Sequence, residues 1–165
     1  MKPMNIDLGT IRSSPFVGVF AVATDKVVLL PELQEVKEKK KLEKLFDCEK
    51  VYTRLANSSL LGVLAAGNSN GFVVGEIAEE QELEALERNG IIIKKVLGIT
   101  ALGNLMGCND KVAFCAKTLP DKAVKTIGEA LKVKCVRTEV AGSDLIGSAM
   151  VLTNKGFIAH PMISE

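Results

Sequence analysis

The chain alternates between short apolar runs of strand length and longer segments that carry apolar residues on one helical face. Four apolar runs contain a glycine near their start and polar residues six to eight positions after it. Asn and Asp tolerate the left-handed backbone of a tight reversal, so this pattern predicts a β-hairpin. The four stretches are VGVFAVATDKVVLLP from Val17, LGVLAAGNSNGFVVGE from Leu61, LGNLMGCNDKVAFCAK from Leu102 and IGSAMVLTNKGFIAHP from Ile146.

The four predicted hairpins recur at a nearly constant interval. Aligned on Gly18, Gly62, Gly103 and Gly147, they are 44, 41 and 44 residues apart. A fixed period in this range indicates a repeat architecture in which each copy is one supersecondary unit. The stretch LIGSAMVLTNKGFIAHP, from Leu145 to Pro161, is therefore the fourth copy.

A helix and a further strand are expected after each of the first three hairpins. Pro120 opens a run whose apolar residues Ala123, Val124, Ile127, Ala130 and Leu131 have helical spacing. Two further segments show the same spacing with weaker stripes. They are Glu32 to Phe46, with apolar Leu33, Val36, Leu42, Leu45 and Phe46, and Glu79 to Arg88, with Leu83 and Leu86. The strand-like runs that follow are EKVYTRL from Glu49, IIIKKVLG from Ile91 and VKCVRTEV from Val133.

One unit is thus strand, strand, helix, strand, and the predicted fold class is α+β. A three-stranded sheet with one helix cannot bury both of its faces, so the units must pack on one another around a shared core. The predicted units are residues 13–57, 58–100, 101–142 and the partial unit 143–165, all within one domain. Residues 1–12, with the run NIDLGTIR, are expected to form a strand that pairs with the last unit and closes a ring.

Composition changes this picture little. The 165 residues suit one compact domain, and 21 Lys and Arg against 20 Asp and Glu leave a net charge of +1, too small to attract a polyanion over the whole surface. No apolar run approaches the roughly 20 residues of a membrane span, so no membrane partner is expected. The N-terminus has no apolar signal-peptide region, and a cytoplasmic location is expected.

Four cysteines and one histidine are the candidates for redox, metal or nucleophilic chemistry. Cys48, Cys108, Cys115 and Cys135 form no C-x-x-C pair, so reduced, buried thiols are expected, with no metal site and no cofactor. His160 is the only histidine, and no cysteine lies in a local signature that would bring a nucleophile to it. We therefore expect no catalytic residues and no small-molecule substrate.

Three segments resemble the archaeal and eukaryotic translation initiation factor 6 family, the ribosome anti-association factors. They are ALGNLMGCNDKVA (101–113), LKVKCVRTEVAGSDLIGSAMVLTNKGFIAHP (131–161) and SSLLGVLAAGNSNGFVVGEIAEEQELEAL (58–86). They occur in the family's order and at its spacing. The resemblance implies a pentein fold, in which five such units surround a central channel.

The resemblance also implies a function. Members bind the large ribosomal subunit on the face that meets the small subunit, mainly through a ribosomal protein, and so prevent joining; they also act in large-subunit biogenesis. By resemblance, the expected partners are that ribosomal protein and, as a further contact, adjacent ribosomal RNA.

One departure from the family pattern concerns length. Five units of this period would need roughly 220 residues, whereas the chain holds three whole units and one hairpin. The sequence is then either a fragment of a longer factor or a naturally shortened ring closed by residues 1–12. An open arc would expose strand edges and an apolar sheet face, for which self-association is expected.

The predicted ribosome-binding residues lie on one rim of the ring. Asn104 follows Gly103 directly, where the aligned copies have Val19, Val63 and Ser148, and a strand start has no backbone need for Asn. The family's ALGN asparagine belongs to the rim that meets the large subunit, and Asn104 matches it. The expected site is Asn104 with Gly18, Val63 and Ser148, in a flat and mostly polar protein interface.

Two other classes of function stay open at this point. Penteins include guanidine-modifying enzymes that use a Cys and a His, which here would need His160. The third alternative is a repeat scaffold that binds a protein other than the ribosome.

Overall fold

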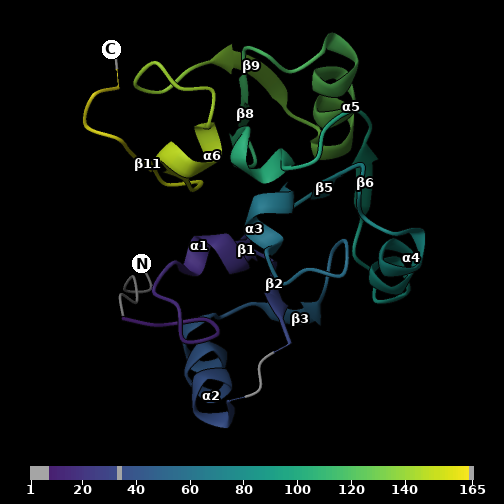
Figure 1. Cartoon of the computed structure of the whole chain (residues 1–165), viewed down its shortest axis with the longest axis vertical. Coiled ribbons are helices and arrows are strands. Elements are labelled where there is room, and N and C mark those ends of the chain that lie inside the picture. The colour runs from purple at the N-terminus through teal and green to yellow at the C-terminus, as the bar shows by residue number, and fades with distance from the viewer. Residues whose placement is uncertain (1–7, 33–34, 164–165) are drawn as a thin grey trace.

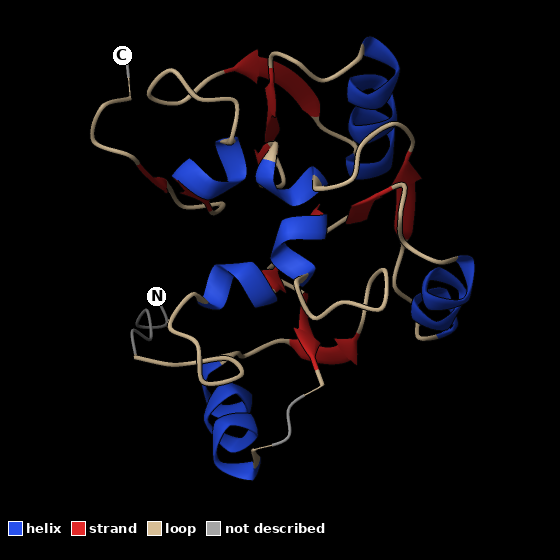
Figure 2. Cartoon of the chain, viewed as in Figure 1, coloured by secondary structure: helices blue, strands red, loops and turns tan. Residues whose placement is uncertain are grey.

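Three complete modules and one hairpin make up the computed structural model, which describes residues 8–32 and 35–163. Each module begins with a short helix, continues with an antiparallel strand pair and, in the first three, adds a long helix and a third strand parallel to the second. This is the strand, strand, helix, strand order predicted from the sequence. The three-stranded sheets are separate from one another, as Figure 2 shows.

The element bounds follow the repeat. Module 1 has α1 (Val17–Phe20), β1 (Val22–Ala23), β2 (Val27–Pro31), α2 (Val36–Leu45) and β3 (Glu49–Thr53). Module 2 has α3 (Leu61–Leu64), β4 (Ala65–Asn68), β5 (Gly71–Gly75), α4 (Glu80–Arg88) and β6 (Ile93–Val96). Module 3 has η1 (Leu102–Asn104), β7 (Met106–Cys108), β8 (Val112–Ala116), α5 (Asp121–Leu131) and β9 (Lys134–Thr138), and the last hairpin has α6 (Ile146–Ala149), β10 (Met150–Leu152) and β11 (Phe157–Ala159).

The modules follow one another around an arc (Figure 1). The long helices α2, α4 and α5 lie on the outside, the short helices lie on the inside, and α1 and β11 lie on the open side at the left. The helices form where the sequence predicted them, with a Glu79–Glu82 capping box at the start of α4 and a left-handed Lys132 after α5. Only Leu42 of α2 is buried, and Val36, which was predicted to lie on the apolar face of this helix, is 66% exposed.

The glycine-led segments were predicted to be strands from their first residues, and this is wrong. Each glycine lies in a short helix, and the strand begins only after it. The glycines permit close packing between modules. A Cβ on Gly62 would lie 1.9 Å from the Gly18 carbonyl oxygen, and one on Gly103 would lie 2.2 Å from that of Gly62. A Cβ on Gly147 would likewise lie 1.9 Å from the carbonyl oxygen of Gly103, so the main chains of successive short helices touch directly.

Each sheet face is buried by the module that follows it. The facing pair Val22 and Leu29 in module 1 is 8% and 0% exposed, because the α3 and α4 side chains of module 2 pack on it. The corresponding pair in module 2, Ala66 and Val73, is 8% and 0% exposed. In the last hairpin the equivalent residues Val151 and Ile158 are 64% and 78% exposed. The arc therefore presents an apolar sheet face on its last hairpin.

The four hairpin turns lie side by side and are joined by hydrogen bonds. The Ser69 N–H donates to Asp110 Oδ1 at 2.8 Å, and the Asp110 N–H donates to Asn154 Oδ1 at 2.9 Å. Asn154 Nδ2 then donates to Asp25 Oδ2 at 2.8 Å, across 129 residues of sequence, and Lys26 Nζ donates to the Ser69 carbonyl oxygen at 2.8 Å. These contacts link all four turns in a closed circuit.

Buried Asn68 adds two further hydrogen bonds between the second and third modules. It is 3% exposed, and its Nδ2 donates to the carbonyl oxygens of Asn109 at 3.1 Å and Leu131 at 2.9 Å. The asparagines of the turns therefore have a structural role that includes contacts between modules.

The predicted ring-closing strand falls partly outside the described residues, since positions 1–7 are not among them. Residues 8–10 are in no strand, and Ile11 forms only an isolated bridge with nearby Ser14. Ile11 is nevertheless fully buried, in a cluster with Val28, Leu30 and Leu42. The described part of this segment thus packs on module 1.

Replacing Gly103 by alanine should destabilise the fold by about 3 kcal/mol, because the new methyl group has only main-chain atoms to displace. Gly18 is the matched control, since it occupies the same repeat position in α1 and a Cβ added there would have nothing within 4 Å. Gly18→Ala should leave stability unchanged or raise it slightly, as Ala favours a helix. Urea unfolding of both variants tests this, and equal stabilities would contradict the packing described.

The free energy of unfolding should also fall at low pH, as the Asp110 carboxylate becomes protonated. Partial burial raises the pKa of this carboxyl, but hydrogen bonds from Ser69 and Asn154 and the Lys26 ammonium outweigh it, and the net effect lowers the pKa. A lowered folded-state pKa stabilises the fold in full above the unfolded-state pKa of about 3.9, and this contribution is lost as pH falls through the folded-state pKa.

The variant Asp110→Asn isolates this contribution. At pH 7 it should be less stable than the parent by about 1–2 kcal/mol, because one carboxylate that accepts from two donors is lost. The gap should shrink as pH falls below about 4 in paired urea titrations. A gap that stays constant down to about pH 3 would show that ionised Asp110 does not hold the turns together.

Self-association through the exposed hairpin face stays a prediction. Burying Val151 and Ile158 against another apolar surface would remove two large aliphatic side chains from water, which favours association. Sedimentation velocity over a hundredfold concentration range should show rising mass for the parent chain and a constant monomer mass for Val151→Lys with Ile158→Lys. A parent chain that stays monomeric throughout would refute the prediction.

Candidate functional site

The predicted site residues lie in the four short helices on the inside of the arc. Gly18 is in α1, Val63 in α3, Asn104 in η1 and Ser148 in α6. Asn104 is therefore not at the start of a strand, as the sequence suggested; β7 begins two residues later, at Met106. The contacts between successive glycines hold these helices side by side, so the fold brings the four residues onto one rim.

Three of the four short helices follow a turn that is hydrogen-bonded to the start of the helix. Isolated bridges join Leu55 to Ser58 and Val140 to Ser143, as Ile11 is joined to Ser14. The serine hydroxyl then accepts a hydrogen bond from the main chain two residues later, at 3.1 Å for both Leu60 and Leu145. Module 3 has Ile99 in place of this serine, and its helix is the shorter η1.

Carboxylates of the long helices clamp two of these turns. Glu82 accepts hydrogen bonds from the N–H groups of Ala56 at 2.6 Å and Asn57 at 2.8 Å, both of which have positive φ. Glu38 accepts from the N–H of Arg12 at 3.0 Å in the equivalent turn of module 1. Two of the turns that precede the rim helices are therefore fixed to the long helices by hydrogen bonds.

Two of the predicted residues contact each other directly. The Ser148 hydroxyl lies 3.4 Å from Asn104 Oδ1 and donates to it, which leaves the Asn104 amide nitrogen free of any hydrogen bond to the described residues. Ser148 is exposed and Asn104 is half-buried. The Asn104 side chain is thus oriented by α6 while its donor group is available to a partner.

The rim has no charge and carries exposed apolar side chains. The helix sequences VGVF, LGVL, LGN and IGSA contain no Lys, Arg, Asp or Glu. Two positions before the glycines of three copies, Phe16 is 70% exposed, Leu60 is 39% exposed and Leu145 is 48% exposed. A surface of this kind suits a protein partner better than nucleic acid, which requires Lys and Arg to contact phosphates.

Sequence reasoning missed Phe16, Leu60 and Leu145. Phe16 and Leu60 stand just before the predicted hairpin stretches, which were taken to begin at Val17 and Leu61, and Leu145 was counted with the fourth hairpin. The repeat alignment held the missing signal, because an apolar residue stands two positions before the glycine in every copy. Only the helical turn shows that the first apolar residue faces solvent while the second, such as Leu61 or Ile146, is buried.

The cysteines lie in environments that favour the neutral thiol. Burial raises the pKa of Cys108 to about 12, and its Sγ donates to the Gly67 carbonyl oxygen at 3.1 Å. Burial and the neighbouring Cys135 thiol raise the pKa of Cys115 to about 12 as well. A nucleophilic cysteine needs the opposite shift, toward thiolate at neutral pH.

His160 has a local structural contact. Its Nδ1 accepts a hydrogen bond from the Met162 N–H at 3.2 Å, and its own N–H donates to the Ala149 carbonyl oxygen at 2.8 Å. Within residues 8–32 and 35–163, no hydrogen bond joins it to a thiol, and no group of three His, Cys, Asp or Glu side chains is placed to hold a metal ion. None of the helices in those ranges is long and apolar enough to cross a membrane.

A solved structure shares the fold. C. jejuni agmatine deiminase superposes with a TM-score of 0.53 at 14% sequence identity, over 74% of this chain and 50% of that one. Identity at this level speaks for the fold alone. The predicted pentein-type arrangement of repeated modules is thereby confirmed.

Curated relatives match over most of the chain. The translation initiation factor 6 of Pyrococcus horikoshii is 40% identical over 173 aligned positions, which cover 98% of this chain and 74% of the relative. That of Staphylothermus marinus is 35% identical over 163 positions, covering 94% of this chain and 71% of the relative. The family model described as the eIF-6 family matches residues 6–165. The chain therefore belongs to the eIF-6 family.

Proposed function

We propose that this protein binds the joining face of the large ribosomal subunit through the rim of α1, α3, η1 and α6, and so keeps the small subunit from joining. The relatives are named translation initiation factors, which supports a role in initiation. The observation that carries the proposal is the repeated rim itself, with the free amide of Asn104 beside exposed Leu60 and Leu145. Such a factor acts in the cytoplasm and by occupancy, without catalysis.

A ribosomal protein is the expected main contact on the subunit. Phe16, Leu60 and Leu145 supply apolar anchors, and Asn104 supplies a donor, which is the composition of the centre of a protein interface. The helices carry no Lys or Arg for ribosomal RNA phosphates, so any charged contact to RNA would come from residues outside the rim. The same contact on a maturing large subunit would account for a role in ribosome biogenesis.

The guanidine-modifying alternative has no specific observation in its favour. The likeness to the deiminase is one of fold, and the thiols of Cys108 and Cys115 have raised pKa values. A scaffold for a partner other than the ribosome would use the same rim, and the subunit-binding experiment distinguishes it.

Changing Asn104 to Asp should weaken binding to purified large subunits about tenfold, because the free amide donor becomes a carboxylate acceptor in an uncharged interface. The thermal midpoint should change little, since the new carboxylate still accepts from Ser148. Cosedimentation with large subunits measures the affinity, and sedimentation of mixed subunits measures joining.

Asn89→Asp is the matched control for this experiment. Asn89 is exposed at the end of α4, which lies on the outside of the arc, and the substitution introduces the same charge. It should leave subunit binding unchanged. Equal affinities for the Asn104 variant, the control and the parent would refute the rim as the binding surface, and cosedimentation with small subunits instead would refute the function.

A further inference from the structure

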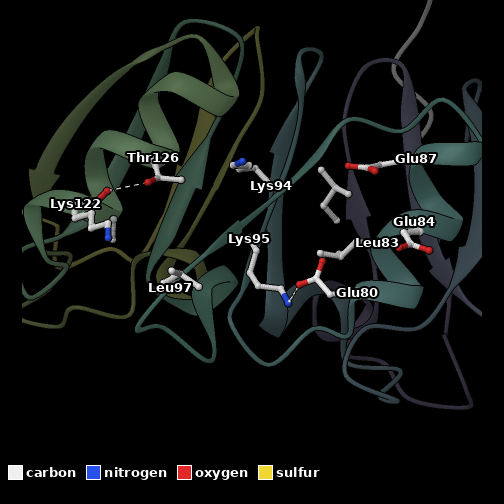
Figure 3. A pocket seen from close by; sticks show the side chains of 11 residues that line it. Glu80, Leu83, Glu84, Glu87, Lys94, Lys95, Leu97, Lys122 and Thr126 are labelled. Atoms are coloured by element: carbon white, nitrogen blue, oxygen red, sulfur yellow. Dashed lines mark hydrogen bonds and ion pairs between the residues drawn. The ribbon is translucent and has the colours of Figure 1, made fainter.

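A cavity of about 430 Å³ lies between the two outer helices α4 and α5, away from the rim. The strand β6 runs between its walls, as Figure 3 shows. Leu83 and Ala123 contribute apolar surface, and Leu97 at the end of β6 is 63% exposed. The proposed binding to the large subunit through the rim does not involve this surface.

The strand β6 has an unpaired edge facing this cavity. It is the last strand of the sheet β4-β5-β6 and pairs, in parallel, with β5 only. The Phe72 N–H donates to the Ile92 carbonyl oxygen at 2.8 Å, so the polar main-chain groups of Ile92 and, by alternation, of Lys94 point toward β5. Those of Ile93 and Lys95 then point outward. A strand edge of this kind accepts another extended chain.

The two helices lie on opposite faces of β6. Ile93 is buried in the same cluster as Leu83 of α4, whereas Val96 is buried in the cluster that holds Ala123 and Ile127 of α5. Successive side chains of a strand point to opposite faces. An extended segment added to the edge of β6 would therefore direct its side chains alternately toward α4 and toward α5.

The two walls carry opposite charge. The α4 wall presents Glu84 and Glu87, one and two turns beyond Glu80, which is paired with Lys95. The α5 side presents Lys122, together with Lys94 on the same face of β6. With respect to the residues in the described ranges, the side chains of Glu84, Glu87, Lys94 and Lys122 form no ion pair or hydrogen bond. Two carboxylates and two ammonium groups thus remain available to a ligand.

We propose that this groove binds an extended segment of a partner protein, which adds a strand to the free edge of β6. Basic residues of the segment face Glu84 and Glu87, and the acidic residues that alternate with them face Lys94 and Lys122. Main-chain hydrogen bonds to Ile93 and Lys95 supply affinity, and the alternating charges supply specificity. The site is independent of subunit binding, and both can be occupied together.

A polyanion fits this groove poorly. The carboxylates of Glu84 and Glu87 would repel phosphates, and the two available lysines offer few contacts. A polypeptide is the class of ligand that can present both charges at the two-residue period of a strand.

The probe is an eight-residue blocked peptide of alternating Lys and Glu, with a block-patterned peptide of the same composition, KKEEKKEE, as the control. The alternating peptide places all its lysines on one face, and the control does not. At low salt the alternating peptide should bind the full chain at least about fivefold more tightly. It should also slow hydrogen exchange at the Ile93 and Lys95 amides. Equal affinities, or unchanged exchange at those amides, would overturn the proposal.

Charge reversal tests the walls. Glu84→Lys with Glu87→Lys should weaken binding of the alternating peptide about fivefold, and so should Lys94→Glu with Lys122→Glu. Reversal of both walls together should restore the affinity. If the peptide shifts its register on β6 by one residue, its lysines and glutamates exchange faces and again meet walls of opposite charge. Glu49→Lys with Lys134→Glu, on exposed positions of β3 and β9, is the matched control and should have no effect.

Two outcomes would contradict this account. If the variant with all four charges reversed does not regain affinity, the walls do not recognise alternating charge in the peptide. Concentration-dependent dimers of the parent chain that disappear on reversing one wall would identify a second copy, rather than a foreign segment, as the occupant. The reversed variants should unfold at the same temperature as the parent, which shows that they are folded, and their subunit binding should equal that of the parent.

Discussion

The fold depends on one contact, made between each short helix and the next. A carbonyl oxygen of one helix lies where a side chain of the next helix would begin, so that only glycine fits at positions 62, 103 and 147. This contact fixes the distance and the rotation between neighbouring modules. The hydrogen bonds among the turns fix the other end of the hairpins, and the long helices cover the faces between them. The rim is a direct product of this packing, because the same glycines that permit the close approach also align Val63, Asn104 and Ser148.

Much of this arrangement could be predicted because the repeat is written into the sequence at two levels. The interval between glycines indicated the modules, and the helical stripe after Pro120 indicated α5 with Ala123, Ile127 and Leu131 buried. The short helices could not be predicted in this way. Four residues are too few for a helical period to show, and the helical turn is imposed by a neighbouring module's main chain rather than by local propensity.

The site was predictable only in part for the same reason. Asn104 was identified by its odd position in the repeat and by family resemblance, and its neighbour Ser148 follows from the alignment. The exposed apolar residues Phe16, Leu60 and Leu145 were missed. Their exposure depends on the helical turn that follows each of them, and that turn was not predicted. Val36 shows the converse: its apolar spacing predicted burial on α2, yet it is 66% exposed.

The protein has an uncharged rim on the inside of the arc and a charged groove on the outside, and the proposed ribosome contact is assigned to the rim. Hydrogen exchange of the chain with and without purified large subunits tests that assignment most directly. Bound subunits should slow exchange at the amides of α1, α3, η1 and α6 and leave the amides of α4 and α5 unaffected. Protection confined to the outer helices, with the short helices exchanging as in the free chain, would contradict it.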